Sequence, residues 1–156
     1  MLRKIVVVRN GRHEGGILSE FGKLQCHELA RGIKIDVTGV AEIISSSDLQ
    51  VIETVKIFSE MIGVSLRVCE RQLVREDEKV NTDSVMRLIL SYQLELSTRV
   101  IVSHQGYTSI LPKLIFEIYG IKDEVGVIEE GEAGMFDLAN QYSIKIQPPL
   151  GRKGRF

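Results

Sequence analysis

Two short apolar runs in this sequence each end in a polar side chain that could bind an anion. Residues 5–8 (IVVV) lead into Arg9 and Gly11, and residues 99–103 (RVIVS) lead into His104. Arginine presents a planar fork of donors that matches phosphate or carboxylate oxygens, and histidine can donate a charge-assisted hydrogen bond or move a proton near neutral pH. Arg9 and His104 together therefore predict a site for an anionic oxygen ligand, to which the backbone amide of Gly11 would add a donor.

The elements that must position these residues can be read from the hydrophobic pattern. An uninterrupted apolar run is typical of a strand covered on both faces, as in a parallel sheet, and ligands bind beyond the carboxyl ends of such strands. Periodicity, capping residues and glycines predict the remaining elements. They are a helix over 20–31 stopped by Gly32, a strand over 40–44, a helix over 49–62 closed by Gly63, a strand over 65–69, a helix from 82 or 83 to 92, a helix over 108–119, and a hairpin of 135–139 with 142–147. This alternation predicts an α/β fold with a mostly parallel central sheet and helices on both faces.

Length and charge limit the classes of function. The 156 residues predict a single domain over 1–147, followed by a basic tail over 148–156. A net charge of -1 gives no electrostatic reason to expect a nucleic acid or an anionic membrane as partner. No apolar run approaches the roughly 20 residues that span a bilayer, so we expect a cytoplasmic protein. Cys26 and Cys69 have no CxxC or metal spacing, and we expect both thiols to be reduced and buried.

Other groups that could do chemistry carry a weaker signal. His13 and Glu14 lie in a glycine-rich turn, but the second histidine of the HExxH zinc motif and the lysine of a nucleotide P-loop are absent. We therefore expect no metal and no cofactor. The acidic segment 70–78 could supply a general acid, although a solvated surface loop is the favoured interpretation, and the glutamates within 129–132 are interpreted in the same way.

Several of these motifs, taken together, resemble the histidine phosphatase superfamily, also called phosphoglycerate mutase-like. The matching segments are Arg9-Asn10-Gly11, Ser19 opening the first helix, Ser45-Ser46 ahead of 49–54, and Val102-Ser103-His104. The similarity extends from Lys4 to about Ile146 and implies a three-layer α/β/α sandwich. Because the central region carries no large helical insertion, the chain looks most like the compact SixA-type phosphohistidine phosphatases.

The resemblance also shows where this sequence departs from the family. The family's first motif is Arg-His-Gly, whose histidine is phosphorylated during turnover; a second arginine follows the Ser-Ser segment, and a second histidine ends the late strand. Arg9 and His104 match, but Asn10 replaces the nucleophile and Gln50 replaces the second arginine. An asparagine amide cannot attack phosphorus, and exchanging a cation for a neutral amide should weaken binding of a dianion by roughly 1–3 kcal/mol.

These departures predict a catalytically impaired pseudo-phosphatase. It would bind a phosphorylated small molecule or a phosphoprotein segment through a phosphate site made up of Arg9, Asn10, Gly11, Gln50 and His104. The alternative is an active phosphomonoesterase or phosphohistidine phosphatase, which would use a displaced nucleophile such as His13 or a directly activated water. A third interpretation is a scaffold that binds partners elsewhere on its surface.

Overall fold

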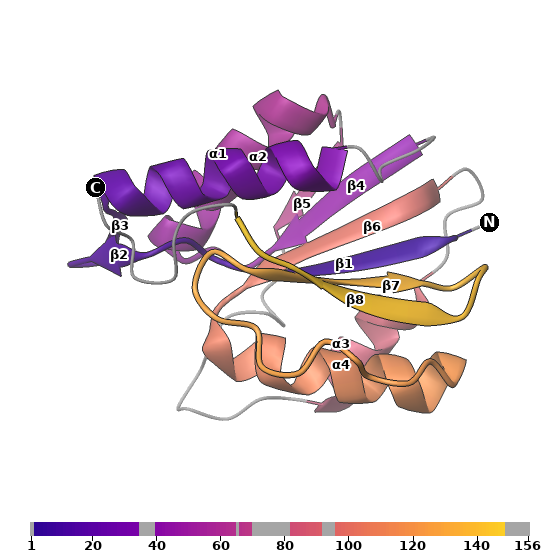
Figure 1. Ribbon diagram of the computed structural model, residues 1–156. Helices are drawn as coiled ribbons and strands as arrows, with labels where there is room; N and C mark the ends of the chain where they lie inside the picture. Colours follow the sequence, from indigo (N-terminus) through magenta and orange to yellow (C-terminus); the bar gives the residue numbers. More distant parts are fainter. Residues whose placement is uncertain (1, 35–39, 65, 70–81, 92–95, 149–156) are drawn as a thin grey trace.

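The computed structural model describes residues 2–34, 40–64, 66–69, 82–91 and 96–148, and its centre is a six-stranded sheet (Figure 1). In spatial order the strands are β5 (Leu66–Cys69), β4 (Val40–Ser45), β6 (Leu96–Ser103), β1 (Lys4–Arg9), β7 (Ala133–Asp137) and β8 (Tyr142–Ile146). The first four are parallel, whereas β7 runs antiparallel to β1 and β8 antiparallel to β7. The predicted mostly parallel sheet and the C-terminal hairpin are therefore confirmed.

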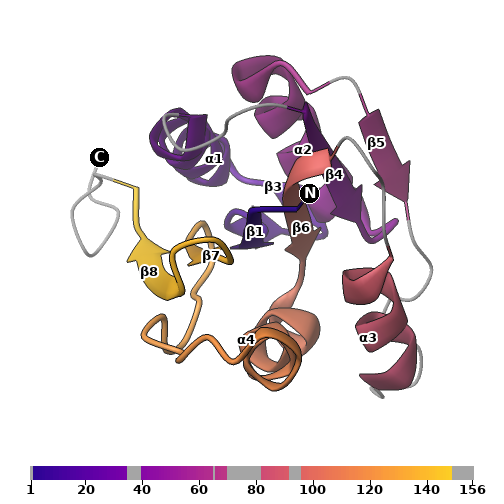
Figure 2. The same ribbon diagram turned by 90° about the vertical axis from the view of Figure 1, so that its right-hand side faces the viewer.

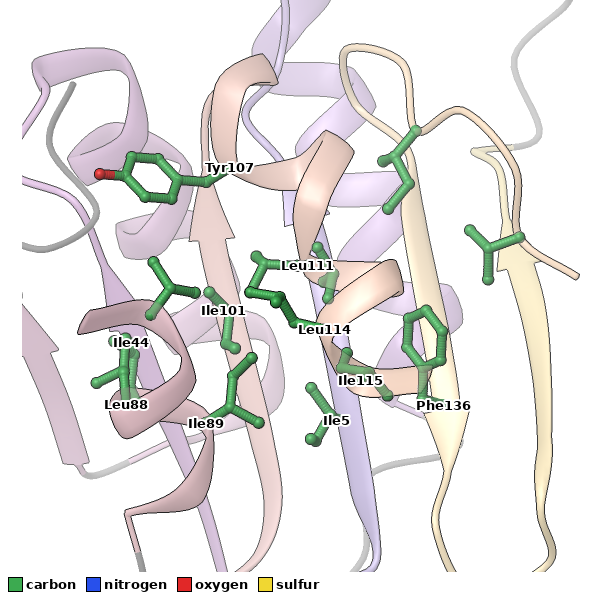
Figure 3. Close-up of a cluster of buried hydrophobic side chains, with 14 of the residues drawn as sticks. Ile5, Ile44, Leu88, Ile89, Ile101, Tyr107, Leu111, Leu114, Ile115 and Phe136 are labelled. Atoms are coloured by element: carbon green, nitrogen blue, oxygen red, sulfur yellow. The ribbon is translucent and has the colours of Figure 1, made fainter. Parts of the chain in front are cut away.

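Helices cover both faces of this sheet (Figure 2). One layer contains α1 (Glu20–Lys34) and α2 (Leu49–Ile62), and the other contains α3 (Thr82–Leu90) and α4 (Gln105–Tyr119). Since side chains alternate along a strand, Ile5 and Val7 join the apolar cluster of α3 and α4, while Val6 and Val8 join that of α1 and α2. Figure 3 shows the first cluster. The molecule is thus the three-layer α/β/α sandwich that the resemblance implied.

Several predicted boundaries were wrong, among them the first hairpin strand, which spans 133–137 rather than 135–139, and α3, which ends at Leu90 rather than at residue 92. Helix α1 continues through Gly32 to Lys34, because Ile33 is fully buried and extends its apolar face. Helix α4 begins at Gln105, three residues earlier than expected, directly after the strand that delivers His104. Strand β6 begins at Leu96 rather than at residue 99. The segment 70–78 and most of the basic tail lie outside the described residues, so the structure does not test those predictions.

A short second sheet was not expected at all. Strands β2 (His13–Glu14) and β3 (Ile17–Leu18) pair antiparallel across Gly15 and Gly16, whose φ angles are 59° and 80°. Two consecutive positive φ angles are what a tight two-residue hairpin requires, and glycine adopts them without a steric penalty. The glycine-rich turn of the sequence is therefore a hairpin that projects beyond the end of β1 (Figure 1).

A buried ion pair connects β4, β6 and α3. Arg99 and Glu42 are neighbours in the register of the two strands, and Nε of Arg99 donates to the Glu42 carboxylate. The remaining guanidinium nitrogens donate to the carbonyl oxygens of Leu88, Ile89 and Ser91 at 2.8–3.1 Å. Arg99 thereby satisfies carbonyls at the end of α3 that have no partner within the helix.

Candidate functional site

The carboxyl ends of β1 and β6 lie side by side, as predicted. Arg9 pairs with Ser103 in the parallel register, and the backbone N–H of Asn10 donates to the carbonyl of Ser103 at 3.0 Å. His104 follows Ser103 directly. The two residues that the sequence singled out for anion binding, Arg9 and His104, are therefore attached to neighbouring strand ends.

The segment that precedes β7 crosses the end of β1 and contacts Arg9. Nη1 of Arg9 lies 3.5 Å from the carbonyl oxygen of Ile128, which is a long hydrogen bond. The backbone N–H of Arg9 donates to the carbonyl of Glu132, and the N–H of Gly131 is shared between the carbonyls of Arg9 and Asn10. The backbone here is firmly fixed, whereas the guanidinium has a weak partner that a ligand could replace.

Asn10 stabilises its own loop. Its side chain is buried, with a relative exposure of 2%, and Nδ2 donates to the carbonyl of Gly11 at 3.0 Å. The same nitrogen lies 3.3 Å from Nδ1 of His13, which in turn lies 3.4 Å from the carboxylate of Glu130. The β2–β3 hairpin thus folds His13 back beside Asn10, an arrangement that the sequence did not require.

The expected backbone donor of Gly11 is engaged inside the protein. Its N–H donates to the hydroxyl of Thr54 at 3.3 Å, and that buried hydroxyl donates to the carbonyl of Gln50 at 2.8 Å. A side chain at position 11 would collide with Cys26 and with the backbone of Gly22, since an added Cβ would lie 2.7 Å from atoms of each. Gly11 is therefore required by the close approach of this loop to α1.

Cys26 lies beneath this loop as a free, buried thiol, which confirms the prediction for one of the two cysteines. Burial raises the pKa of the Cys26 thiol to about 11, although hydrogen bonding with Thr54 acts in the opposite direction. The thiol is thus protonated near neutral pH and unsuited to nucleophilic attack. The side chain of Cys69 lies outside the described part of the structure.

His104 faces a carboxylate that the sequence analysis did not select. Its Nε2 lies 3.9 Å from Oδ2 of Asp48, and its ring packs edge-on against Tyr107 with centroids 5.3 Å apart. The hydroxyl of Ser46 donates to the same Asp48 oxygen at 3.0 Å. The place of Asp48 after β4, the strand adjacent to β6, was the signal that could have found it.

Gln50 lies in the first turn of α2, two residues beyond Asp48, and is half-buried. Its position is next to the site, but its amide carries no charge. Among the described residues no group of three or more His, Cys, Asp or Glu side chains is arranged to hold a metal ion. In the same part of the chain, no helix has the length and apolar character needed to cross a membrane.

Comparisons with known proteins identify the fold. No protein-family model matches this chain, and no curated protein sequence matches it significantly. The structure of the protein histidine phosphatase SixA complexed with tungstate matches with a TM-score of 0.67 at 12% identity, over 93% of this chain and 97% of that chain. A phosphoglycerate mutase from Plasmodium falciparum matches with a TM-score of 0.58 at 14% identity, over 92% and 88% of the two chains. A mycobacterial glucosyl-3-phosphoglycerate phosphatase gives 0.56 at 15% identity, over 94% and 98%.

The chain therefore has the fold of the histidine phosphatase superfamily, as the sequence motifs indicated. Within that superfamily, SixA matches over nearly the whole length of both chains, which confirms the compact SixA-like architecture.

Proposed function

We propose that this protein binds a phosphorylated ligand at the ends of β1 and β6 and does not hydrolyse it by the covalent route of the superfamily. The observation that carries the proposal is Asn10. It follows Arg9 at the point where the resemblance places the nucleophilic histidine, and its amide nitrogen donates to the loop carbonyl of Gly11. An amide lone pair is delocalised, so Asn10 cannot form a phosphoenzyme.

Arg9 and His104 support retained anion binding. They occupy neighbouring strand ends, and within the described part of the chain the guanidinium makes a long hydrogen bond to the Ile128 carbonyl. The similar SixA structure contains tungstate, an oxyanion of phosphate-like shape, which supports an oxyanion site in a protein of this fold. The ligand is expected to be a phosphorylated small molecule or a phosphorylated protein segment.

Turnover of an aryl phosphate tests the proposal. Wild-type protein should release no phenol above the blank, whereas Asn10→His combined with Gln50→Arg should raise the rate. The restored nucleophile could contribute on the order of 10⁴- to 10⁶-fold, although the buried position of Asn10 will limit the gain. Adding Arg9→Ala to the double variant is the control and should abolish its activity. Robust turnover by the wild type would refute the proposal.

Thermal unfolding in the presence of inorganic phosphate tests binding separately. A ligand at 100 times its dissociation constant stabilises the folded state by about 2.7 kcal/mol, so the melting temperature should rise measurably. The rise should disappear in Arg9→Ala. An unchanged melting temperature in the wild type would instead favour a scaffold that binds its partners elsewhere.

A second candidate function is an active phosphatase that uses His13. The contact of Nδ1 with the Glu130 carboxylate favours it, because a carboxylate that accepts the Nδ1 proton leaves the other ring nitrogen with a lone pair. It ranks second because His13 lies on the hairpin beyond the motif. Wild-type turnover that is lost in His13→Ala and retained in His27→Ala, an exposed histidine of α1, would establish it.

A further inference from the structure

Asp48 has an unusual environment for a residue at the start of a helix. It is the N-cap of α2, where an aspartate side chain normally accepts a backbone N–H from the first turn. Here the carboxylate makes no such hydrogen bond. It is directed instead toward Ser46, whose hydroxyl donates at 3.0 Å, and toward Nε2 of His104 at 3.9 Å.

The carboxylate is held in this place. Ser46 is fully buried, so its hydroxyl is a fixed donor, and the Asp48 side chain is only one-third exposed. A carboxylate that lies this close to the anion-binding histidine acts as a resident negative charge. An anion that accepts a hydrogen bond from His104 must share the imidazole with it.

We propose that the negative charge of Asp48 selects the ligand by charge. The site then prefers a singly charged phosphoryl or sulfuryl ester, such as a phosphodiester, to a doubly charged phosphomonoester. The inference depends on the proposed anion site. Arg9 supplies one positive charge at the neighbouring strand end, but Gln50 is neutral and Glu130 adds a second carboxylate beside His13.

The expected size of the effect follows from the geometry. A ligand oxygen about 2.8 Å from Nε2 would lie no more than about 7 Å from the Asp48 oxygen. At that distance, and at an effective dielectric constant between about 20 and 80, each additional negative charge weakens binding by about 3- to 55-fold, with about tenfold as the central value.

Phenyl phosphate and phenyl sulfate have similar shapes and different charges, so a comparison of their dissociation constants isolates the effect of ligand charge. At pH 8 the phosphate ester carries nearly two negative charges, because its second pKa is about 6, and the sulfate ester carries one. Titration calorimetry on the whole protein gives the ratio of the two dissociation constants. Asp48→Asn should shift that ratio about tenfold toward the phosphate, and Asp48→Ser should do the same if the first variant folds poorly, since asparagine and serine are both good N-cap residues.

Glu60→Gln is the matched control. It removes one exposed carboxylate from the far end of the same helix and should leave the ratio unchanged. Binding that requires Arg9 but keeps the same ratio in both Asp48 variants would overturn the role of Asp48 and leave the anion site intact. The absence of binding by either ester in every variant would overturn both.

Discussion

Replacing Arg99 with methionine is expected to lower the free energy of unfolding by about 3–5 kcal/mol. Arg99 is 1% exposed, and its guanidinium donates to the carboxylate of Glu42 and to three backbone carbonyls at and just beyond the end of α3. Methionine occupies a comparable volume but donates no hydrogen bond. The substitution therefore leaves a buried carboxylate without its cation and removes the guanidinium donors of the carbonyls, of which that of Leu88 still accepts from Ser91.

Urea denaturation at neutral pH measures this loss, with an unchanged slope showing that only stability has altered. Arg31→Met is the matched control, because the exposed Arg31 side chain pairs with Glu28 at 3.3 Å, and ion pairs at the surface contribute at most about 1 kcal/mol. The double variant Arg99→Met with Glu42→Gln should lose less stability than the two single losses added together. A loss for Arg99→Met as small as that of the control would refute the reasoning.

Two further stability predictions concern α1. Gly22→Ala should destabilise the protein by about 1–3 kcal/mol, because the added Cβ would lie 2.0 Å from the carbonyl oxygen of Arg12. Gly32→Ala should stabilise it by about 0.5–1 kcal/mol, because the Cβ would lie 3.8 Å from its nearest neighbour, a methyl group of Ile146. Thermal melts compare the two variants. The raised pKa of Cys26, about 11 against an ordinary 9.0, means that the unfolded chain loses the thiol proton first. The neutral thiol therefore contributes fully to the free energy of unfolding below pH 9, and this contribution falls by about 2–3 kcal/mol between pH 9 and 11. Over that range the urea midpoint should fall less in Cys26→Ala than in the wild type.

The strands and their ends could be predicted because the deciding signals are local. The β-branched runs at 5–8 and 99–103 form the adjacent buried strands β1 and β6, and polar residues follow both. Helix α2 also spans the predicted residues, because Asp48 and Gly63 bound a regular apolar stripe. These features depend on periodicity and capping, which a single sequence displays.

The details of the site depend on contacts between distant segments, so the sequence could not display them. A charged residue within a strand is normally exposed, and only the register that places Arg99 opposite Glu42 explains its burial. His13 reaches Asn10 because a hairpin folds back at Gly15 and Gly16. In each case a local pattern fits several environments, and tertiary packing selects one.

The geometry divides the predicted phosphate-binding residues into two groups. Asn10 and Gly11 donate to partners within the loop and α2, through contacts that are buried, so a ligand could take their donors only by disrupting the loop. Among the described residues, the Arg9 guanidinium makes a long bond to the Ile128 carbonyl, and His104 faces the partly exposed carboxylate of Asp48. Exchange of the long Arg9 bond for a ligand costs little, because a hydrogen bond near 3.5 Å contributes little to stability. Anion binding at this edge of the sheet should therefore depend mainly on Arg9 and His104, while Asn10 maintains the loop on which Arg9 is placed.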